Sequence, residues 1–180
     1  MTIVATSLKD RLPTTIRTAR LVLVTPTLAH APAIAQLCNN INVHKWMARL
    51  PFPYALSDAE FFINEIVPSA EEACFAITRD SELMGIVGLH FHPERLPELG
   101  YWLGEPYWGH GYASEAGAAL VEAARAAGAA ALRSRARLDN AGSRNVLRKL
   151  GFTETGETLE TKGNLAGQTM VQMHLEFDPR

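Results

Sequence analysis

The chain has 180 residues, and its 17 Lys and Arg against 19 Asp and Glu give a formal net charge of -2. This length fits one domain with a sizeable core, and a near-neutral charge gives no general attraction to nucleic acid or to an anionic membrane. No apolar run approaches the ~18 residues that span a bilayer, and the N-terminal residues lack the pattern of a signal peptide. We therefore expect a cytoplasmic protein with no nucleic-acid or membrane partner.

The thiol and imidazole groups give no sign of a metal site. Cys38 and Cys74 are isolated in the sequence, which is typical of buried free thiols in a reducing compartment. His90, His92 and His110 are not accompanied by the carboxylate or cysteine cluster that a metal ion needs. We therefore expect no bound metal.

The predicted elements begin after a polar segment, residues 1–15, which we expect to be a loose arm before a single domain of residues 16–180. Residues 20–26 are mostly apolar and end in proline, which predicts a short strand. Thr27 then caps a predicted helix that extends to about Leu37. The domain is thus expected to open with one strand and one helix.

The next segment, residues 43–56, carries three aromatic residues and two prolines, which indicates an ordered loop. Ser57 and Glu60 stand three residues apart before an apolar run, which is the spacing of a capping box and predicts a second helix. This structural role explains Glu60 without a part in catalysis.

The rest of the chain alternates strand and helix patterns. Residues 74–80 and 82–92 predict a hairpin that turns at Asp80 and Ser81. The remaining patterns predict, in order, a strand at 98–104, a helix at 112–128, a strand at 131–139, a helix at 141–151 and a strand pair at 152–160 and 169–177. This order predicts an α/β (α+β) fold with a mixed, mostly antiparallel twisted sheet and helices on both faces. The helix at 112–128 would be the crossover between two parallel neighbouring strands of the sheet.

The segment Pro106–Ala116, PYWGHGYASEA, places Gly109 and Gly111 between a strand and a helix. A helix N-terminus presents unpaired N–H groups and a partial positive charge, and glycine lets a bulky anion approach the backbone closely. The small residues Ala113 and Ser114 continue this open surface, so the pattern predicts a diphosphate site. A P-loop would need a lysine here and a dinucleotide-binding loop would need a parallel sheet before it. A glycine-rich turn without a ligand stays open as an alternative.

The stretch Trp108–Ala113 resembles the pyrophosphate motif of the GNAT superfamily of acetyl-CoA-dependent N-acetyltransferases, Gln/Arg-x-x-Gly-x-Gly/Ala, with Trp108 in place of Gln or Arg. Two longer stretches, ELGYWLGEPYWGHGYASEA and DNAGSRNVLRKLGF, are similar to signatures of the Rim-type branch, which acetylates protein N-termini. The resemblance covers about residues 17–177, and two long motifs at the expected separation are more specific than a lone glycine pattern.

The resemblance implies a coenzyme A site along the strand and the glycine loop. In the family, the strand before the loop offers its backbone to the pantetheine arm, and an asparagine in the second signature contacts the cofactor. The implied cofactor-binding residues here are Tyr101, Trp102, Leu103, Trp108, Gly109, His110, Gly111, Tyr112, Ala113, Ser114 and Asn140. Asn140 would at the same time cap the helix that follows it.

The resemblance also implies direct attack of an amine on the thioester. We expect Glu98 to act as the base, directly or through a water, because family members often carry a carboxylate on this strand. Many members use a tyrosine as the acid, but its position here holds Leu147, so we expect Ser143 to protonate the departing thiolate. The competing interpretations are a surface role for Glu98 and a helix-end role for Ser143.

The acceptor pocket is expected in the N-terminal part of the chain. His44, Trp46 and Tyr54 stand in the segment that shapes this pocket in the family, although core packing explains the aromatic residues about as well. We expect acetyl-CoA as co-substrate, no metal, and a primary amine as acceptor, foremost a protein N-terminal α-amine. A small amine, such as an antibiotic, polyamine or amino acid, and a non-catalytic coenzyme A sensor stay open as alternatives. The closing strand could support a homodimer.

Overall fold

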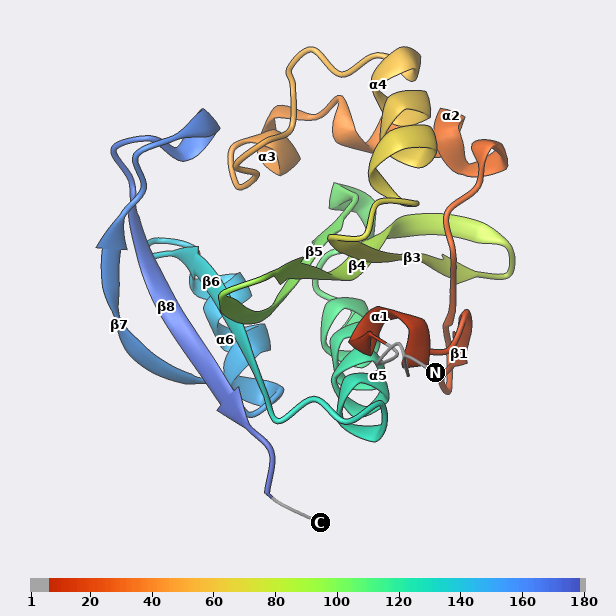
Figure 1. The fold of residues 1–180 in the computed structure, drawn as a ribbon. Coiled ribbons are helices and arrows are strands. Elements are labelled where there is room, and N and C mark those ends of the chain that lie inside the picture. The colour runs from red at the N-terminus through yellow and green to blue at the C-terminus, as the bar shows by residue number, and fades with distance from the viewer. Residues whose placement is uncertain (1–6, 179–180) are drawn as a thin grey trace.

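The computed structural model describes residues 7–178, which form one sheet with helices on both sides (Figure 1). Its strands are β1 (Thr15–Arg17), β2 (Val22–Val24), β3 (Glu72–Arg79), β4 (Glu82–His92), β5 (Arg95–Leu103), β6 (Ala131–Arg137), β7 (Thr153–Leu159) and β8 (Thr169–Glu176). Its α-helices are α1 (Leu8–Arg11), α2 (Ala31–Cys38), α3 (Ile41–His44), α4 (Leu56–Phe61), α5 (Tyr112–Ala126) and α6 (Ala141–Lys149). Shorter helical segments are η1 (Leu28–His30), η2 (Phe62–Ile66), η3 (Glu105–Tyr107) and η4 (Gly163–Leu165).

The strands pair in the order β1-β2-β3-β4-β5-β6-β8-β7. All neighbours run antiparallel except β5 and β6, which are parallel. Figure 1 shows α2, α3 and α4 on one side of the sheet and α5 and α6 on the other. The predicted mixed, mostly antiparallel fold is therefore confirmed, with α5 as the crossover between the parallel strands. Within the described residues, no helix has both the length and the apolar character to cross a membrane.

Alternation along the strands divides the core into two clusters, one on each face of the sheet. On the side of α5 and α6, Leu99 packs in a cluster with Leu120, and the two are 2% and 0% exposed. On the side of α2 and α4, Ile34 and Ile86 belong to the second cluster, and Trp102 packs against it. Full burial of each such side chain contributes about 1.5–3 kcal/mol. Apolar packing thus holds both faces of β5 in place. This strand lies at the centre of the cleft described below.

The hairpin between β3 and β4 turns where the sequence predicts it. Asp80 and Ser81 have φ angles of 49° and 67°, in the left-handed region that short polar side chains tolerate. Two consecutive residues in this region suit the right-handed twist of a two-residue hairpin. The two strands pair from Glu72↔His90 to Arg79↔Glu82, with one register shift between them.

The start of α4 differs from the sequence-based expectation. Ser57 was expected to cap this helix, but the helix begins at Leu56 and Ala55 occupies the N-cap position. The Ala55 N–H donates to Asp58 Oδ2 at 2.7 Å. An acidic side chain three residues beyond the cap therefore satisfies this N–H, a part expected of Glu60.

The expected loose arm, residues 1–15, is ordered in the part that the structure describes. Helix α1 is capped by the Ser7 side chain. Lys9 Nζ donates to the carbonyl of Ser69, which ties this helix to the segment before β3. Residues 1–6 lie outside the described residues.

One carboxylate fastens the turn before β2 to the first turn of α5. Glu115 accepts hydrogen bonds from the Thr18 hydroxyl at 2.6 Å, the Arg20 N–H at 2.8 Å and the Arg20 Nε at 2.6 Å. Burial opposes ionisation of Glu115, but the hydrogen bonds from Thr18 and Arg20 outweigh it and lower the pKa of this carboxyl. This clamp holds the edge of the sheet against the helix that follows the glycine loop.

We expect Glu115→Gln to lower the free energy of unfolding by about 2 kcal/mol at neutral pH, because charge-assisted hydrogen bonds are lost. The folded-state pKa of Glu115 is depressed. Its contribution is therefore present above the unfolded-state pKa, about 4.3, and is lost as the pH falls through the folded-state value. In urea titrations the difference between wild type and variant should shrink below about pH 4.

Glu122→Gln is the matched control on the same helix. The Glu122 side chain is 66% exposed and lies 3.7 Å from Arg125, so its replacement should change the unfolding free energy by less than ~0.5 kcal/mol. Equal losses in the two variants would contradict the clamp.

Candidate active site

Strands β5 and β6 separate and leave a cleft between them. They pair in register only at Glu98↔Arg133. Beyond this point a cavity of about 680 Å³ opens, lined by β5, β6, the glycine loop and the first turns of α5 and α6. Backbone groups at such an opening need another partner, because unpaired N–H and C=O groups are costly away from water. The cleft is therefore a place where an extended ligand can pair with the sheet.

Two side chains mark the ends of this gap along β5. The Ser134 hydroxyl donates to the Leu99 carbonyl at 2.8 Å, and Trp108 Nε1 donates to the Leu103 carbonyl at 2.8 Å. Backbone groups of alternate residues point to the same edge of an antiparallel strand. Tyr101, midway between these two residues, therefore presents its N–H and C=O toward the cleft.

The glycine loop opens onto the same cleft. Gly109 and Gly111 have φ angles of 76° and 79°, and Gly111 is the N-cap of α5. A Cβ built on Gly109 would meet no atom within 4 Å, so the backbone there faces open space. Arg20 Nη1 donates to the His110 carbonyl at 3.0 Å, and its guanidinium lies 4.6 Å from the Tyr112 ring centroid. The clamp residue Arg20 thus supports the loop, while both glycines line the cavity at a helix N-terminus that favours anions.

The first turn of α6 adds polar groups to the cleft. Asn140 caps this helix, and its Oδ1 accepts from the Ser143 N–H at 3.0 Å. The Tyr101 hydroxyl donates to Ser143 Oγ at 2.9 Å, which joins strand and helix by a chain of two hydroxyls. Burial raises the pKa of the Tyr101 phenol, and the hydrogen bond with Ser143 offsets only part of this effect. The phenol therefore keeps its proton at neutral pH.

Glu98 lies where β5 and β6 still pair. Arg133 Nη2 contacts its Oε2 at 2.5 Å, and Arg135 Nε donates to its Oε1 at 3.1 Å. Arg135 also donates to Glu160 Oε2 at 2.5 Å. Guanidinium groups thus engage both oxygens of Glu98 and fix the carboxylate at the closed end of the cleft.

A second cavity, of about 780 Å³, lies between the sheet and the layer of α2 and α4. Gly100, Tyr101 and Trp102 line both cavities. A Cβ built on Gly100 would meet no atom within 4 Å, so no packed side chain fills the space beside this residue. The two cavities therefore adjoin at the bare backbone of β5.

The tip of the β7–β8 hairpin covers the cleft. Asn164 Nδ2 donates to the carbonyls of Leu50 at 2.6 Å and Met47 at 3.1 Å, and its N–H donates to the Ala48 carbonyl at 2.9 Å. Figure 1 shows this tip, η4, reaching toward α3. Leu165 is 3% exposed and lines the first cavity. Residues 47–50 and η4, which are far apart in the sequence, thus cover the cleft together.

Helix α3 is anchored beside the cleft by polar contacts. Asn40 and Asn42 donate through their Nδ2 atoms to the two oxygens of Glu105, at 2.6 and 3.0 Å. Trp46, just after α3, lies with its ring centroid 4.9 Å from the Arg137 guanidinium, a cation–π distance. These contacts hold α3 and Trp46 at the side of the cleft.

Most of the predicted site residues come together. The first cavity is lined by Trp46, Glu98, Tyr101, Trp102, Leu103, Trp108, Gly109, Gly111, Tyr112, Ala113, Ser114, Asn140 and Ser143. Tyr54 lines the second cavity instead. His44 and His110 line neither cavity. The His44 ring packs 5.0 Å from Phe52, and the His110 ring stacks 5.6 Å from Tyr112. The functional roles of all these residues stay predictions.

Sequence reasoning missed two side-chain arrangements. The phenol of Tyr101 meets Ser143, although only the backbone of this residue was singled out. His90 Nδ1 lies 2.7 Å from Glu72 Oε1 beside the second cavity. Strand parity was the available signal for Tyr101, since it shares a face with Leu99, whereas nothing in the sequence pairs His90 with Glu72. Among residues 7–178, no group of three or more His, Cys, Asp or Glu could hold a metal ion.

A family model described as the acetyltransferase (GNAT) domain matches residues 20–153 of the chain. The chain belongs to this family. The match spans β2 to the start of β7 and so contains the glycine loop and both walls of the cleft. The predicted GNAT membership of this acetyltransferase is therefore confirmed.

Solved structures show the same fold as this acetyltransferase. The microcin C7 self-immunity acetyltransferase MccE, in complex with acetyl-CoA and AMP, is 22% identical with a TM-score of 0.81, covering 93% of this chain and 98% of that one. RimJ of Mycobacterium smegmatis, in complex with a CoA disulfide, is 20% identical with a TM-score of 0.81, over 91% and 88%. The Salmonella typhimurium acetyltransferase that modifies the N-terminal serine of 50S subunit protein L7/L12 is 20% identical with a TM-score of 0.79, over 91% and 99%. A search of curated proteins found no match in sequence.

Proposed function

We propose that this acetyltransferase moves the acetyl group of acetyl-CoA to a primary amine by direct attack in a ternary complex. The observation that carries the proposal is the meeting of two cavities at Gly100 on β5. A donor in the first cavity and an acceptor in the second would bring the amine to the thioester without a covalent enzyme intermediate. Holding both reactants in this way makes the reaction effectively unimolecular.

The first cavity has the features that coenzyme A requires. The diphosphate would bind at Gly109, Gly111 and the N-terminus of α5, where backbone and helix dipole favour an anion. The amide-bearing pantetheine arm would pair with the backbone of Tyr101 as an added strand in the gap between β5 and β6. Lys149 also lines this cavity and would add positive charge near the cofactor phosphates.

Ser143 and Tyr101 would serve the leaving thiolate. When the C–S bond breaks, Ser143 Oγ can donate its hydrogen to the sulfur while the Tyr101 hydroxyl donates to Ser143. The buried phenol keeps its proton at neutral pH, so this relay starts in the protonated form. Tyr101 on β5 thus supplies a phenol in a chain where the usual tyrosine position on α6 is Leu147.

Glu98 takes a structural part in this proposal. Accepting a proton would weaken its ion pairs with Arg133 and Arg135. Those pairs hold β5 and β6 together at the closed end of the cleft, where the strands begin to separate. The base that the reaction needs is therefore to be sought among other groups on the acceptor side.

The favoured acceptor is a protein N-terminal α-amine. Support comes from the likeness in fold to RimJ and to the acetyltransferase that modifies the N-terminal serine of L7/L12. An α-amine has a pKa of about 8, against about 10.4 for a lysine side chain, so more of it is neutral and nucleophilic at neutral pH. A cavity open beside the exposed Phe61 of α4 suits an extended chain behind that amine.

Labelled acetyl-CoA and a panel of amines test this function. We expect peptides with a free N-terminal serine or alanine to be acetylated with a kcat/KM at least tenfold above that of polyamines and free amino acids. Acetylation of small amines alone would move the acceptor to that class. Binding of acetyl-CoA without acetylation of any amine would instead identify a coenzyme A sensor.

Gly109→Ala tests the cofactor site. A methyl group at this residue would project into the cleft where the diphosphate is expected, so affinity for acetyl-CoA should fall at least tenfold, about 1.4 kcal/mol. Gly128→Ala is the control, because Gly128 also has a positive φ, 92°, but lines neither cavity. Both changes should strain the backbone by about 1–2 kcal/mol. Unchanged calorimetric affinity in a folded Gly109→Ala variant would refute the diphosphate assignment.

Ser143→Ala tests the proton relay. We expect kcat to fall about 10–100-fold, because the thiolate loses its donor, while affinity for acetyl-CoA stays unchanged. Ser143→Thr, which keeps the hydroxyl, should retain most of the rate. The defect of Ser143→Ala should be smaller with an acetyl-CoA analogue whose leaving thiol is more acidic. A defect of the same size with both donors would show that Ser143 only positions the ligand.

A further inference from the structure

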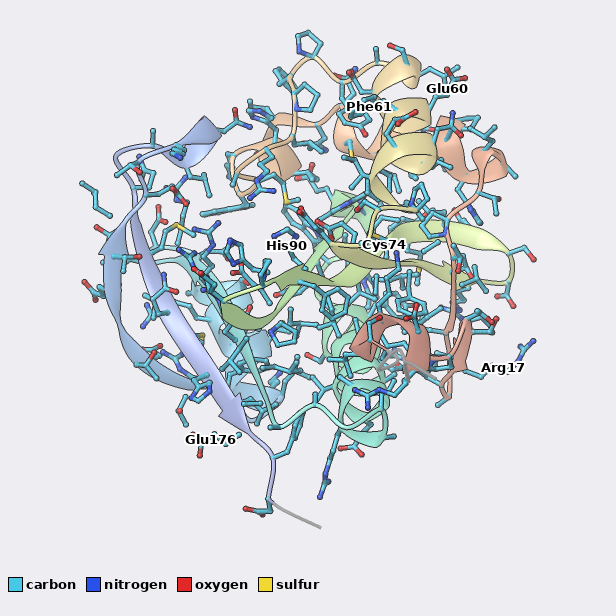
Figure 2. All side chains as sticks on the ribbon, in the orientation of Figure 1. Arg17, Glu60, Phe61, Cys74, His90 and Glu176 are labelled. Atoms are coloured by element: carbon cyan, nitrogen blue, oxygen red, sulfur yellow. The ribbon has the colours of Figure 1, made fainter. Side chains whose placement is uncertain are left out.

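A line of polar residues crosses the sheet at the second cavity. Strand register places Glu72 on β3 opposite His90 on β4, and His90 opposite Glu98 on β5. Directly opposed residues point to the same face of a sheet, and all three line the second cavity. Figure 2 shows His90 and Cys74 on the side of the sheet that faces α4. The acceptor side of β5 therefore carries titratable groups that the relay at Ser143 does not use.

His90 and Glu72 form a hydrogen-bonded pair. Their Nδ1 and Oε1 atoms are 2.7 Å apart, and the side chains are 29% and 21% exposed. A carboxylate only accepts, so Nδ1 carries the hydrogen and donates it, and the neutral ring has its lone pair on Nε2. Within residues 7–178, Nε2 of His90 has no hydrogen-bond partner, while the residue lines the cavity. The ring is thus oriented to accept a proton.

The pair lies close to the bare backbone of β5. Gly100 follows Glu98 by two residues on the same face, and Gly88 precedes His90 by two residues on the adjacent strand. These two glycines face each other in register. Neither therefore places a side chain in the space between His90 and the backbone of β5 at Gly100. A step of two residues is about 6.8 Å. An amine held at Gly100 would therefore reach His90 directly or through one water.

The neighbouring groups are less suited to take a proton. Both oxygens of Glu98 are engaged by guanidinium groups. His92, two residues beyond His90, pairs in register with Arg95 and lines neither cavity. Burial raises the pKa of the Cys38 and Cys74 thiols to about 12, so both stay neutral. The carboxylates of Asp58, on α4, and Glu71, before β3, line the same cavity but do not lie on β4 or β5 beside Gly100. His90 is therefore the group on these two strands with an available lone pair.

The charge around His90 suits a cationic acceptor. Burial likewise raises the pKa of Tyr54, which keeps this phenol neutral. The other charged groups that line the second cavity are Arg49, Asp58, Glu71, Glu72 and Glu98. Arg133 and Arg135 already compensate Glu98, but the other carboxylates still outnumber Arg49. Opposite charges attract more strongly at a partly buried site than in bulk water. An ammonium ion is therefore drawn to the side of β5 where His90 lies.

We propose that His90 takes a proton from the acceptor ammonium, with Glu72 as the positioning residue that fixes its tautomer. This inference rests on the proposed amine acetylation. The ammonium gives one proton to Nε2, and the neutral nitrogen attacks the thioester carbon. As the C–N bond forms and the C–S bond breaks, Ser143 delivers its proton to the sulfur and takes one from the Tyr101 hydroxyl. The nitrogen releases its second proton to water, and water returns a proton to the Tyr101 phenol. The imidazolium returns its proton to water at the cavity mouth, which leaves the amide, the thiol and one proton.

Kinetics with a peptide that has a free N-terminal serine test His90. His90→Ala should lower kcat about 100-fold, the usual range for a positioned base, and leave the Kd for acetyl-CoA within twofold. Added imidazole should restore part of this rate. His92→Ala, on the same strand but outside both cavities, is the matched control and should keep full activity. A His90→Ala rate within twofold of wild type, or a loss that follows weaker acetyl-CoA binding, would overturn the proposal.

Glu72 has a separate readout in NMR spectra that resolve the imidazole nitrogens. Wild-type His90 should show the Nδ1–H tautomer, and Glu72→Ala should move it toward Nε2–H and lower kcat about tenfold. Glu72→Gln, whose amide oxygen can still accept from Nδ1–H, should keep the tautomer and most of the rate. A wild-type ring in the Nε2–H form would overturn the positioning role.

The two proposals fail in different ways. A wild type that acetylates no amine contradicts the proposed function and, with it, the proton transfer. A wild type that acetylates the peptide, while His90→Ala does so equally well, contradicts His90 alone.

Discussion

The separation of β5 from β6 beyond Glu98 and Arg133 is the constraint on which the rest of the site depends. Strands that stayed paired would satisfy each other's backbone and leave no room for a ligand. The crossover helix α5 has to leave the end of β5 and return to the start of β6, so its N-terminus lies at the open end of the gap. One connection therefore supplies both a free strand edge and a helix N-terminus whose dipole favours anions. The two arginines on Glu98 lie where the separation begins.

The pleat of β5 then divides the chemistry between two sides of one strand. Tyr101 points toward α6 and meets Ser143, whereas Trp102 packs toward α2 and α4. Gly100 lies on the same face as Trp102 and adds no side chain there. A group that serves the leaving thiolate and a group that serves the incoming amine can thus stand close together without contact. In the proposed mechanism, this division keeps the two proton transfers apart.

Patterns local in the sequence predicted most of the fold and part of the site. Alternation and helical periodicity gave the strands from β3 to β8 and both long helices, because those signals depend on neighbours a few residues away. The sequence pattern that predicted the glycine loop was equally local. The predicted start of α4 was wrong because Ser57 and Asp58 both suit a helix start, and only the backbone path decides between them.

Contacts between distant segments could not be predicted from the sequence. The pairing of Glu72 with His90 depends on the register of β3 against β4, and the meeting of Tyr101 with Ser143 depends on where α6 lies. Glu98 looked available because its arginine partners lie on β6, beyond the crossover helix. In each case the residue types were visible, and the missing information was the distance between elements.

Contacts made by Asn164 and β8 form late during synthesis of the chain. The hydrogen bond from Asn164 to Leu50 joins residues 114 positions apart, and β8, the last strand in sequence, lies inside the sheet between β6 and β7. Such contacts cannot form until residues 164–176 have been made. A nascent chain on the ribosome would therefore have its glycine loop and its α5 but an uncovered cleft and an unpaired edge on β6. The cleft would therefore stay uncovered until η4 and β8 (Thr169–Glu176) have been made.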